Sequence, residues 1–295
     1  MPVALWSDWH WAEVVEAAMV NFVIAYELKI ARARVRTLVQ KIISLAKYHQ
    51  VGAKYPGIVV CLGGDMLSGD IHEELSQTNE VAMAPAFVDL FGVLVWALTT
   101  LAEEFGRVFV VCVAGNHTRT TTRSTYKDSV HKTWDWLLGT MLERHFANDK
   151  RFAFLVPNNS DAHFEVAGHR FLLTHGNNLG VAGGDGIIEA LGLIIRGDVK
   201  ARRQSDSVGL GYETLLLGHW HQSVPIVPRV VVNGCLVGYS EYAKDRLRAP
   251  YEPPSQTMLM VHPSVGIVAP WVICLEPTGR NLKRPAWVSW PDQKA

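Results

Sequence analysis

The stretch LLLGHWHQS, residues 215–223, carries the first clue to the fold and its chemistry. An aliphatic run that leads into Gly218 is typical of a buried strand that ends in a sharp turn. His219 and His221 then stand on either side of Trp220. Imidazole is a common metal ligand, so this strand end predicts a metal site. One pair of histidines cannot hold a metal alone, and the rest of the chain has to supply the other ligands.

Similar runs predict the elements of the first half of the chain. Continuous apolar runs predict buried strands over residues 3–6, 58–62 and 108–113. Apolar residues at three- and four-residue spacing predict helices over residues 21–48, 85–105 and 132–146. The apolar face of the last of these helices is expected to comprise Trp134, Leu137, Leu138, Met141 and Leu142. Strands that alternate with helices in this way indicate an α/β fold.

The second half is richer in strands. The segment HFEVAGHRFLLTHG predicts two strands joined at Ala167 and Gly168, and a helix is expected over residues 185–195. Short strands are expected over residues 213–217, 224–227 and 230–232, and a hairpin over residues 258–261 and 267–273. The 295 residues, of which 48% are hydrophobic, can build one large core. We therefore expect a single domain over residues 1–276 and an irregular C-terminal tail over residues 277–295.

Charge and cysteine content narrow the functional classes. The chain has 28 basic and 28 acidic residues, so a polyanion would have to be bound by a local patch or by metal. Cys61 and Cys112 lie in apolar runs and no CxxC pair occurs, which predicts reduced, buried thiols and a cytoplasmic protein. The N-terminus lacks the pattern of a signal peptide. The uncharged run over residues 90–102 is shorter than the ~20 residues that span a bilayer, so we expect a buried helix and no membrane contact.

Residues that can bind metal follow five of the predicted strands. They are Asp8 and His10, Asp65, Asn116 and His117, His175, and His219 and His221. Sheets of α/β proteins bind ligands at the carboxyl ends of their strands. In DxH and HxH, residues two apart on an extended chain project to the same side and can converge on one centre. Glycines before three of these residues allow close backbone approach. Two divalent cations about 3.5–4 Å apart can share one bridging carboxylate.

These motifs, in this order, resemble the calcineurin-like metallophosphoesterase superfamily. The pattern DxH, GD, GNH, a later His and GHxH is found at residues 8–10, 64–65, 115–117, 175 and 218–221. The resemblance covers roughly residues 3–223. It implies an α/β fold of two packed mixed β-sheets flanked by helices, a four-layer α/β/β/α sandwich.

The resemblance also implies a role for each residue. Asp8, His10 and His221 would hold one metal, Asn116, His175 and His219 would hold a second, and Asp65 would bridge both. His117 would assist the leaving group while a metal-activated hydroxide attacks phosphorus. The resemblance implies Mn²⁺, and the mixed imidazole and oxygen donors also suit Fe, Zn, Co or Ni.

Two positions depart from the pattern of many relatives. Thr118 follows GNH where an acidic residue is usual, and Ser68 stands three residues after Asp65 where an acid commonly orients the catalytic histidine. Asp70 and Glu73 are the candidates to replace that acid. The departures count against a protein phosphatase and leave open what orients His117.

The segment after GNH bears on the substrate. Residues 118–127, TRTTTRSTYK, place Arg119 and Arg123 beside His117 and predict phosphate contacts. His72 and Tyr239 are further candidates for substrate contact. Trp9 and Trp220 stand between ligands and would either pack in the core or stack on a base.

The chain also resembles phage-type and prophage-type phosphoesterases described as DNA-repair-exonuclease-like. We therefore expect it to hydrolyse a phosphodiester bond, with nucleic acid as the favoured substrate. If the chain is encoded by a phage, it would act in the cytoplasm of the bacterial host. A small nucleotide or phosphomonoester is the alternative substrate, and a non-catalytic, metal-stabilised scaffold is the alternative function. The sequence leaves DNA against RNA, exonuclease against endonuclease, and monomer against homodimer open.

Overall fold

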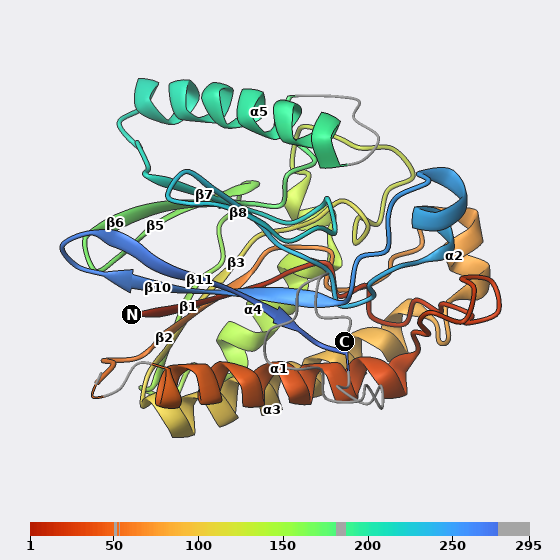
Figure 1. Ribbon diagram of the computed structural model, residues 1–295, viewed down its shortest axis with the longest axis horizontal. Coiled ribbons are helices and arrows are strands. Elements are labelled where there is room, and N and C mark those ends of the chain that lie inside the picture. The colour runs from red at the N-terminus through yellow and green to blue at the C-terminus, as the bar shows by residue number, and fades with distance from the viewer. Residues whose placement is uncertain (50–51, 53, 181–186, 277–295) are drawn as a thin grey trace, which may run out of the picture.

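The computed structural model describes residues 1–49, 52, 54–180 and 187–276, in which two β-sheets pack face to face between layers of helices (Figure 1). Helices α1 (Leu28–Tyr48), α3 (Met83–Phe105) and α4 (Trp134–His145) cover the outer face of the first sheet. Helix α5 (Ile187–Ser207) covers the outer face of the second. This is the four-layer α/β/β/α arrangement that the sequence predicts. The tail over residues 277–295 lies outside the described residues.

The first sheet joins the two ends of the chain. Its strands, in spatial order, are β11 (Gly266–Cys274), β10 (Ser255–His262), β1 (Pro2–Trp6), β2 (Ile58–Leu62), β3 (Val108–Cys112) and β4 (Phe152–Leu155). Strands β1 to β4 run parallel, whereas β10 pairs antiparallel with β1. The expected C-terminal hairpin therefore completes the sheet that the first residues begin. Strand β4 has no counterpart among the predicted strands.

The second sheet contains the strands between the two halves of the first. Their spatial order is β5 (Asp161–Val166), β6 (His169–Thr174), β7 (Thr214–Leu217), β9 (Val230–Val232) and β8 (Val224–Ile226). Strands β6, β7 and β9 run parallel. Strands β5 and β6 form the predicted hairpin, whose loop residues Ala167 and Gly168 both have positive φ, as tight hairpin turns require.

Burial on both faces explains the continuous apolar run of β2. Val59 and Cys61 point into the core between the two sheets, whereas Ile58, Val60 and Leu62 point toward the helices. A strand covered on both sides has no face on which polar residues would alternate.

Two predicted helices have different bounds in the structure. Helix α1 begins at Leu28 rather than at residue 21, because Asn21 and Phe22 adopt positive φ and the Glu80 carboxylate accepts a hydrogen bond from the Leu28 amide (2.6 Å). Helix α5 continues to Ser207, well beyond residue 195. The second half of the helix is polar, and the buried Asp198 forms an ion pair there with Arg202. The apolar pattern could therefore not predict this half of the helix. Residues 185–186 of that prediction lie outside the described residues.

Helix α4 buries only part of the predicted face: Leu138 and Leu142 are buried and Trp134 packs against the core, as predicted. Leu137 and Met141 are 37% and 39% exposed, whereas Asp135, Leu138, Gly139 and Leu142 are buried. Gly139 lies against β3, where a β-carbon at this position would lie 3.1 Å from that of Cys112. The unexpected member of the buried face is the carboxylate of Asp135.

Helix α3 is the most apolar helix of the fold. An 18-residue window of this 23-residue helix reaches a mean hydropathy of 1.7, so by length and composition alone the helix could cross a bilayer, and it is longer than the uncharged run over residues 90–102. In this fold Leu90, Leu94 and Leu98 are fully buried in the core that α3 shares with α1 and the first sheet. The helix thus buries one face only: a third of its apolar window is buried, and Val88 and Trp96 are exposed, so it is less buried than the sequence predicts.

Three short helical segments have no counterpart among the predicted elements. These are α2 (Glu73–Thr78), a 3-10 turn η1 (Val130–Lys132) and a π-helical turn η2 (Tyr242–Arg246).

The cysteines provide a test of the core. Cys61, Cys112 and Cys235 are buried and Cys274 is exposed, and burial raises the pKa of the Cys61 and Cys112 thiols. We expect a thiol reagent such as 5,5′-dithiobis(2-nitrobenzoate) to modify Cys274 alone in the folded protein and all four thiols in denaturant. Rapid modification of two or more thiols without denaturant would contradict this packing.

Candidate metal centre

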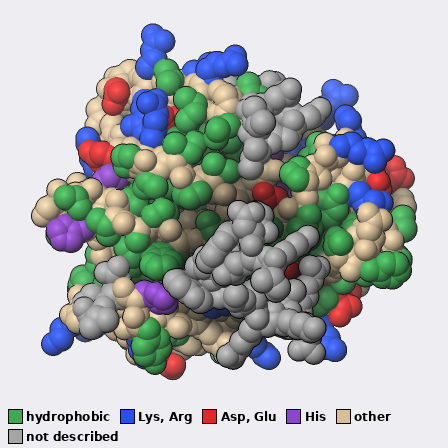
Figure 2. All heavy atoms as spheres, in the orientation of Figure 1, with side chains coloured by type: hydrophobic (Ala, Val, Ile, Leu, Met, Phe, Trp, Pro, Cys, Tyr) green, Lys and Arg blue, Asp and Glu red, His purple; other side chains and the backbone are tan. Residues whose placement is uncertain are grey.

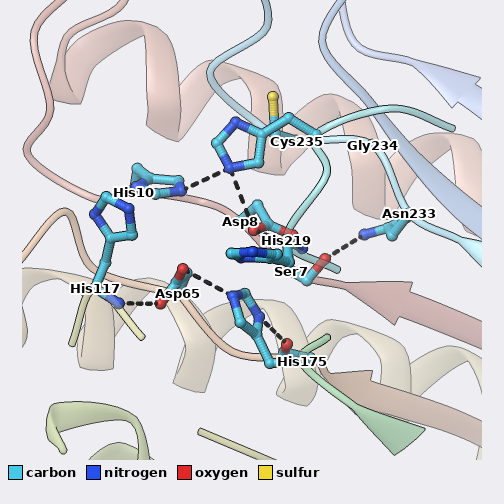
Figure 3. A network of polar contacts seen from close by, with 12 residues as sticks. Ser7, Asp8, His10, Asp65, His117, His175, His219, Asn233, Gly234 and Cys235 are labelled. Atoms are coloured by element: carbon cyan, nitrogen blue, oxygen red, sulfur yellow. Dashed lines mark hydrogen bonds and ion pairs between the residues drawn. The ribbon is translucent and has the colours of Figure 1, made fainter. Parts of the chain in front are cut away.

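The predicted ligands lie on loops that follow parallel strands. Loops after β1, β2 and β3 of the first sheet meet loops after β6 and β7 of the second (Figure 3). Two hydrogen bonds join the sheets here: the His219 amide donates to the Asp8 carboxylate (3.1 Å), and His175 Nδ1 donates to the Gly63 carbonyl (2.9 Å). The carboxyl ends of both sheets thus close on one buried site.

One group of ligands consists of Asp8, His10 and His221. His221 Nε2 lies 3.4 Å from Asp8 Oδ1 and 3.1 Å from His10 Nε2. The candidate ligand atoms of all three residues lie within 4.8 Å of one another. Two imidazole nitrogens that face each other at this distance need a cation or a proton between them, because their lone pairs otherwise repel.

A second group consists of Asp65, His175 and His219. His175 Nε2 lies 2.9 Å from Asp65 Oδ2, and the candidate ligand atoms again lie within 4.8 Å of one another. Asn116 is in the loop that touches Asp65, and its Oδ1 is buried without a hydrogen-bond partner among the described residues. An unpartnered buried oxygen is costly unless a ligand completes it, and a cation would do so.

Electrostatics tie the two groups together at Asp65. Burial alone would raise the pKa of Asp65, but His175, His117 and His10 outweigh burial and hold it below its usual range. Burial works against a charged His175, yet the Asp65 carboxylate raises the pKa of His175 to about 9. Burial and the neighbouring His175 lower the pKa of His219 to about 4. Asp65 therefore lies between imidazoles of both groups (Figure 3), and its carboxylate is close enough to share a cation with His175 and His219.

The backbone at the ligands differs from the expected extended conformation. Five of them have positive φ: Asp8, His10, Asp65, His219 and His221. Convergence thus comes from left-handed turns rather than from an extended DxH or HxH. Left-handed non-glycine residues are uncommon and concentrate at functional sites.

The glycines between these residues have the expected role. A β-carbon at Gly115 would overlap the Asp65 carboxylate, and one at Gly218 would lie 2.5 Å from Asp8 Oδ2. Side chains at these positions would push the ligand loops apart.

His117 is oriented by main chain and not by an acid. His117 Nδ1 donates to the Ser68 carbonyl (3.1 Å). The chain passes close to His117 here, because a β-carbon at Gly69 would overlap the carbonyl oxygen of His117. Within the described residues neither Asp70 nor Glu73, both exposed, bonds to His117. The remaining ring nitrogen, Nε2, is left for the centre. Burial lowers the pKa of His117, against the opposing charge of Asp65.

The expected substrate contacts fall in different surroundings. His72 is exposed, and its ring centre lies 5.5 Å from that of His117. Arg123 is exposed on the loop after His117. Arg119 instead donates to three carbonyls of its own loop, including that of Asn116 (3.0 Å). Tyr239 packs against the core, with its ring 5.8 Å from that of Tyr251.

The two tryptophans between the ligands also differ from each other. Trp9 is fully buried in the core, which agrees with the packing alternative. Trp220 is partly exposed, with its ring 5.1 Å from that of His219, so it lies beside the second group.

A polar frame behind the ligands was not apparent in the sequence. The fully buried Gln256 accepts hydrogen bonds from the Ser7 amide and Trp9 Nε1, and it donates to the Ser7 and Gly234 carbonyls. The buried Asn233 donates to Ser7 Oγ (2.9 Å; Figure 3). These contacts fix the main chain on both sides of Asp8. The contacts to Ser7 and Trp9 join residues 226–249 positions apart, so no local pattern could reveal them.

Two further residues support the imidazoles of the first group. Glu13 Oε2 lies 3.5 Å from His10 Nδ1, and burial raises the pKa of Glu13 to about 7. Burial lowers the pKa of His221, but the Cys235 thiol and the Asp8 carboxylate outweigh burial and raise this pKa. Partners behind ligating histidines fix which nitrogen faces the metal. The spacing of Glu13, three residues after His10, is the one signal that the sequence offered.

Comparison with solved structures shows distant likeness in backbone arrangement. Vps29 from Entamoeba histolytica complexed with Zn²⁺ is 14% identical, with a TM-score of 0.37, and the match covers 94% of this chain and 100% of that chain. Thermotoga maritima protein TM1076 is 12% identical, with a TM-score of 0.33, covering 92% and 98%. Likeness at this level says nothing about the activity of the chain. No family model and no curated protein matches the sequence.

Proton release tests whether His175 binds metal. With a pKa of about 9, the ring carries a proton at pH 7 that a cation must displace. We expect Mn²⁺ affinity to rise between pH 7 and 9, by up to about tenfold per pH unit for the proton on His175 and more steeply where His221, whose pKa is also raised, loses a proton as well. Calorimetric titrations in buffers of different ionisation heat would measure the released proton. Equal affinity at both pH values, without proton release, would contradict this assignment.

Proposed function

We propose that the chain is a dimetal phosphoesterase that hydrolyses phosphodiester bonds. The observation that carries the proposal is the pair of adjoining ligand groups with Asp65 between them and His117 beside them. Three side chains would hold one ion (Asp8, His10 and His221), three would hold the other (Asn116, His175 and His219), and Asp65 would contact both. Divalent ions bound there would neutralise the phosphate and supply hydroxide at neutral pH. Mn²⁺ is the ion that we propose, and the donor set also suits Fe, Zn, Co or Ni.

His117 is the proposed acid for the leaving oxygen. The Nδ1 hydrogen is committed to the Ser68 carbonyl, so Nε2 would transfer the proton, which it carries only in the protonated ring; burial disfavours that form and the Asp65 charge favours it. The ring lies 4.7 Å from that of His10, which places it at the edge of the first ligand group. The exposed His72, next to His117, can contact the substrate from the solvent side.

Nucleic acid is the substrate that we favour. The loop after His117 carries the exposed cations Arg123 and Lys127 and the exposed ring of Tyr126, which suit a backbone phosphate and a base. Elsewhere the Lys and Arg side chains are scattered around the edge of the face in Figure 2, as the zero net charge suggests. Recognition would therefore depend on this loop and on the centre itself. The resemblance to phage-type DNA-repair-exonuclease-like enzymes supports the same substrate.

A small phosphate ester is the second candidate. Arg119 is the cation nearest to His117 in sequence. Its guanidinium donates three hydrogen bonds to loop carbonyls, so few donors remain for a polyanion. A short substrate would need fewer contacts outside the centre.

Substrate panels separate these candidates. We expect the protein with Mn²⁺ to cleave single- or double-stranded DNA or RNA, and bis-p-nitrophenyl phosphate faster than p-nitrophenyl phosphate. Chelation should abolish turnover and added Mn²⁺ should restore it. Preference for the monoester would reject the nuclease proposal. Binding of Mn²⁺ without hydrolysis of any substrate would instead favour a metal-stabilised scaffold.

The role of His117 can be separated from metal binding. We expect His117→Ala to lower kcat by about 10²–10⁴-fold, the contribution of general acid catalysis, while two Mn²⁺ ions stay bound. Asp65→Asn, the matched control, should lose both metal and turnover. Turnover rates and metal content by elemental analysis would be measured on the same samples. Loss of metal from His117→Ala would make that residue a ligand instead.

A further inference from the structure

The buried carboxylate of Asp135 joins two ligand loops. It is 4% exposed at the second residue of α4 and accepts four hydrogen bonds. Oδ2 accepts from the Asp65 amide (2.9 Å), the Gly115 amide (2.9 Å) and Thr118 Oγ1 (2.7 Å), and Oδ1 accepts from the Met66 amide (3.2 Å). Two of these donors belong to the loop after β2 and two to the loop after β3.

The position of these donors matters for the candidate centre. The loop after β2 carries Asp65, and the loop after β3 carries Asn116 and His117. The loops already touch, because a β-carbon at Gly115 would overlap the Asp65 carboxylate. The carboxylate of Asp135 therefore sets the distance between the bridging ligand and the residues that face it.

Stability alone does not explain an acid at this position. Burial and the nearby charge of Asp65 disfavour the ionised form and raise the pKa of Asp135 to about 6. A buried charge costs free energy unless several donors satisfy it, and here all four come from the ligand loops. Helix α4 contributes its positive end, with Thr133 as the N-cap.

We propose that Asp135 is a positioning residue of the metal centre. It supplies from α4 the carboxylate that the chain lacks at Thr118, directly after GNH, and the Thr118 hydroxyl donates to it. This inference rests on the proposed function, since it concerns the same centre. Asp135 touches no predicted ligand side chain and acts through the main chain of the loops.

Mn²⁺ binding by the apoprotein tests the proposal without relying on turnover. Asp135→Asn keeps one acceptor oxygen and loses the charge, so we expect about tenfold weaker Mn²⁺ binding, and about 100-fold for Asp135→Ala, the range for groups that support ligands. In any active preparation kcat should fall more than KM rises, because the reacting groups are displaced. Thr118→Val removes one donor and should weaken binding by a few-fold, which keeps the test available if Asp135→Ala does not fold.

The matched control is Asp198→Asn. Asp198 is also fully buried and accepts from Arg202 (3.0 Å), Arg229 (2.6 Å) and Tyr212 (3.0 Å), but it lies on α5 behind the second sheet. The substitution Asp198→Asn should lower the melting temperature and leave the Mn²⁺ affinity within twofold of that of the unmodified chain.

The outcomes distinguish this inference from the proposed function. The positioning role would be overturned if Asp135→Asn and Asp135→Ala bound Mn²⁺ as tightly as the unmodified chain. It would also be overturned if Asp135→Asn and Asp198→Asn lost equal Mn²⁺ affinity. Neither result would affect the proposed hydrolysis by the unmodified chain. Weakened binding in the Asp135 variants alone would support it even if the unmodified chain hydrolysed no phosphoester.

Discussion

Main-chain contact between the ligand loops is the constraint on which the candidate centre depends. The pairing of β1 with β2 continues beyond both strands, because the Asp8 amide donates to the Gly64 carbonyl (3.0 Å) and the His10 amide to the Asp65 carbonyl (3.1 Å). Gly115 and Gly218 let the neighbouring loops close on the two carboxylates. Loops this close can present their side chains to one point only through tight turns, which is why five ligands take the left-handed conformation, at a cost of about 1–3 kcal/mol each. The rigid strands behind them, buried on both faces, bear that strain.

Charge is concentrated where the loops meet. Asp8 and Asp65 are removed from water, and imidazoles from both sheets surround them. In the protein alone, a proton on His175 balances the Asp65 carboxylate, which is why the pKa of this imidazole is raised. Divalent cations would take over that balance and satisfy the unpartnered oxygen of Asn116. The two sheets meet at the same place, so each group of ligands needs loops from both sheets.

The sequence revealed the elements whose signal is local. Apolar runs of β1, β2 and β3 and the spacing of α1 and α3 could be predicted, because each depends on residues within a few turns or strand positions of one another. The candidate ligands could be named from the sequence as well, since each follows a buried run and the order of the motifs resembles that of a known family; the structure brings six of them into two groups. The errors occurred where a polar contact overrides the apolar pattern. At the start of α1, the Glu80 carboxylate accepts a hydrogen bond from the Leu28 amide. In α5, the ion pair of Asp198 with Arg202 stabilises the polar half of the helix.

Local sequence patterns were therefore enough to predict the strands other than β4, the order of the motifs and the seven candidate ligands. Only the tertiary structure decided how those ligands converge, through left-handed turns, and which groups hold them. Gln256 reaches Ser7 from 249 positions away, and Asp135 contacts Asp65 from 70. The carbonyl of Ser68, which orients His117, is a main-chain group that every residue type carries. The physical reason is the same in each case: a buried polar group is defined by the partner that satisfies it, and that partner is brought close only when the chain has folded.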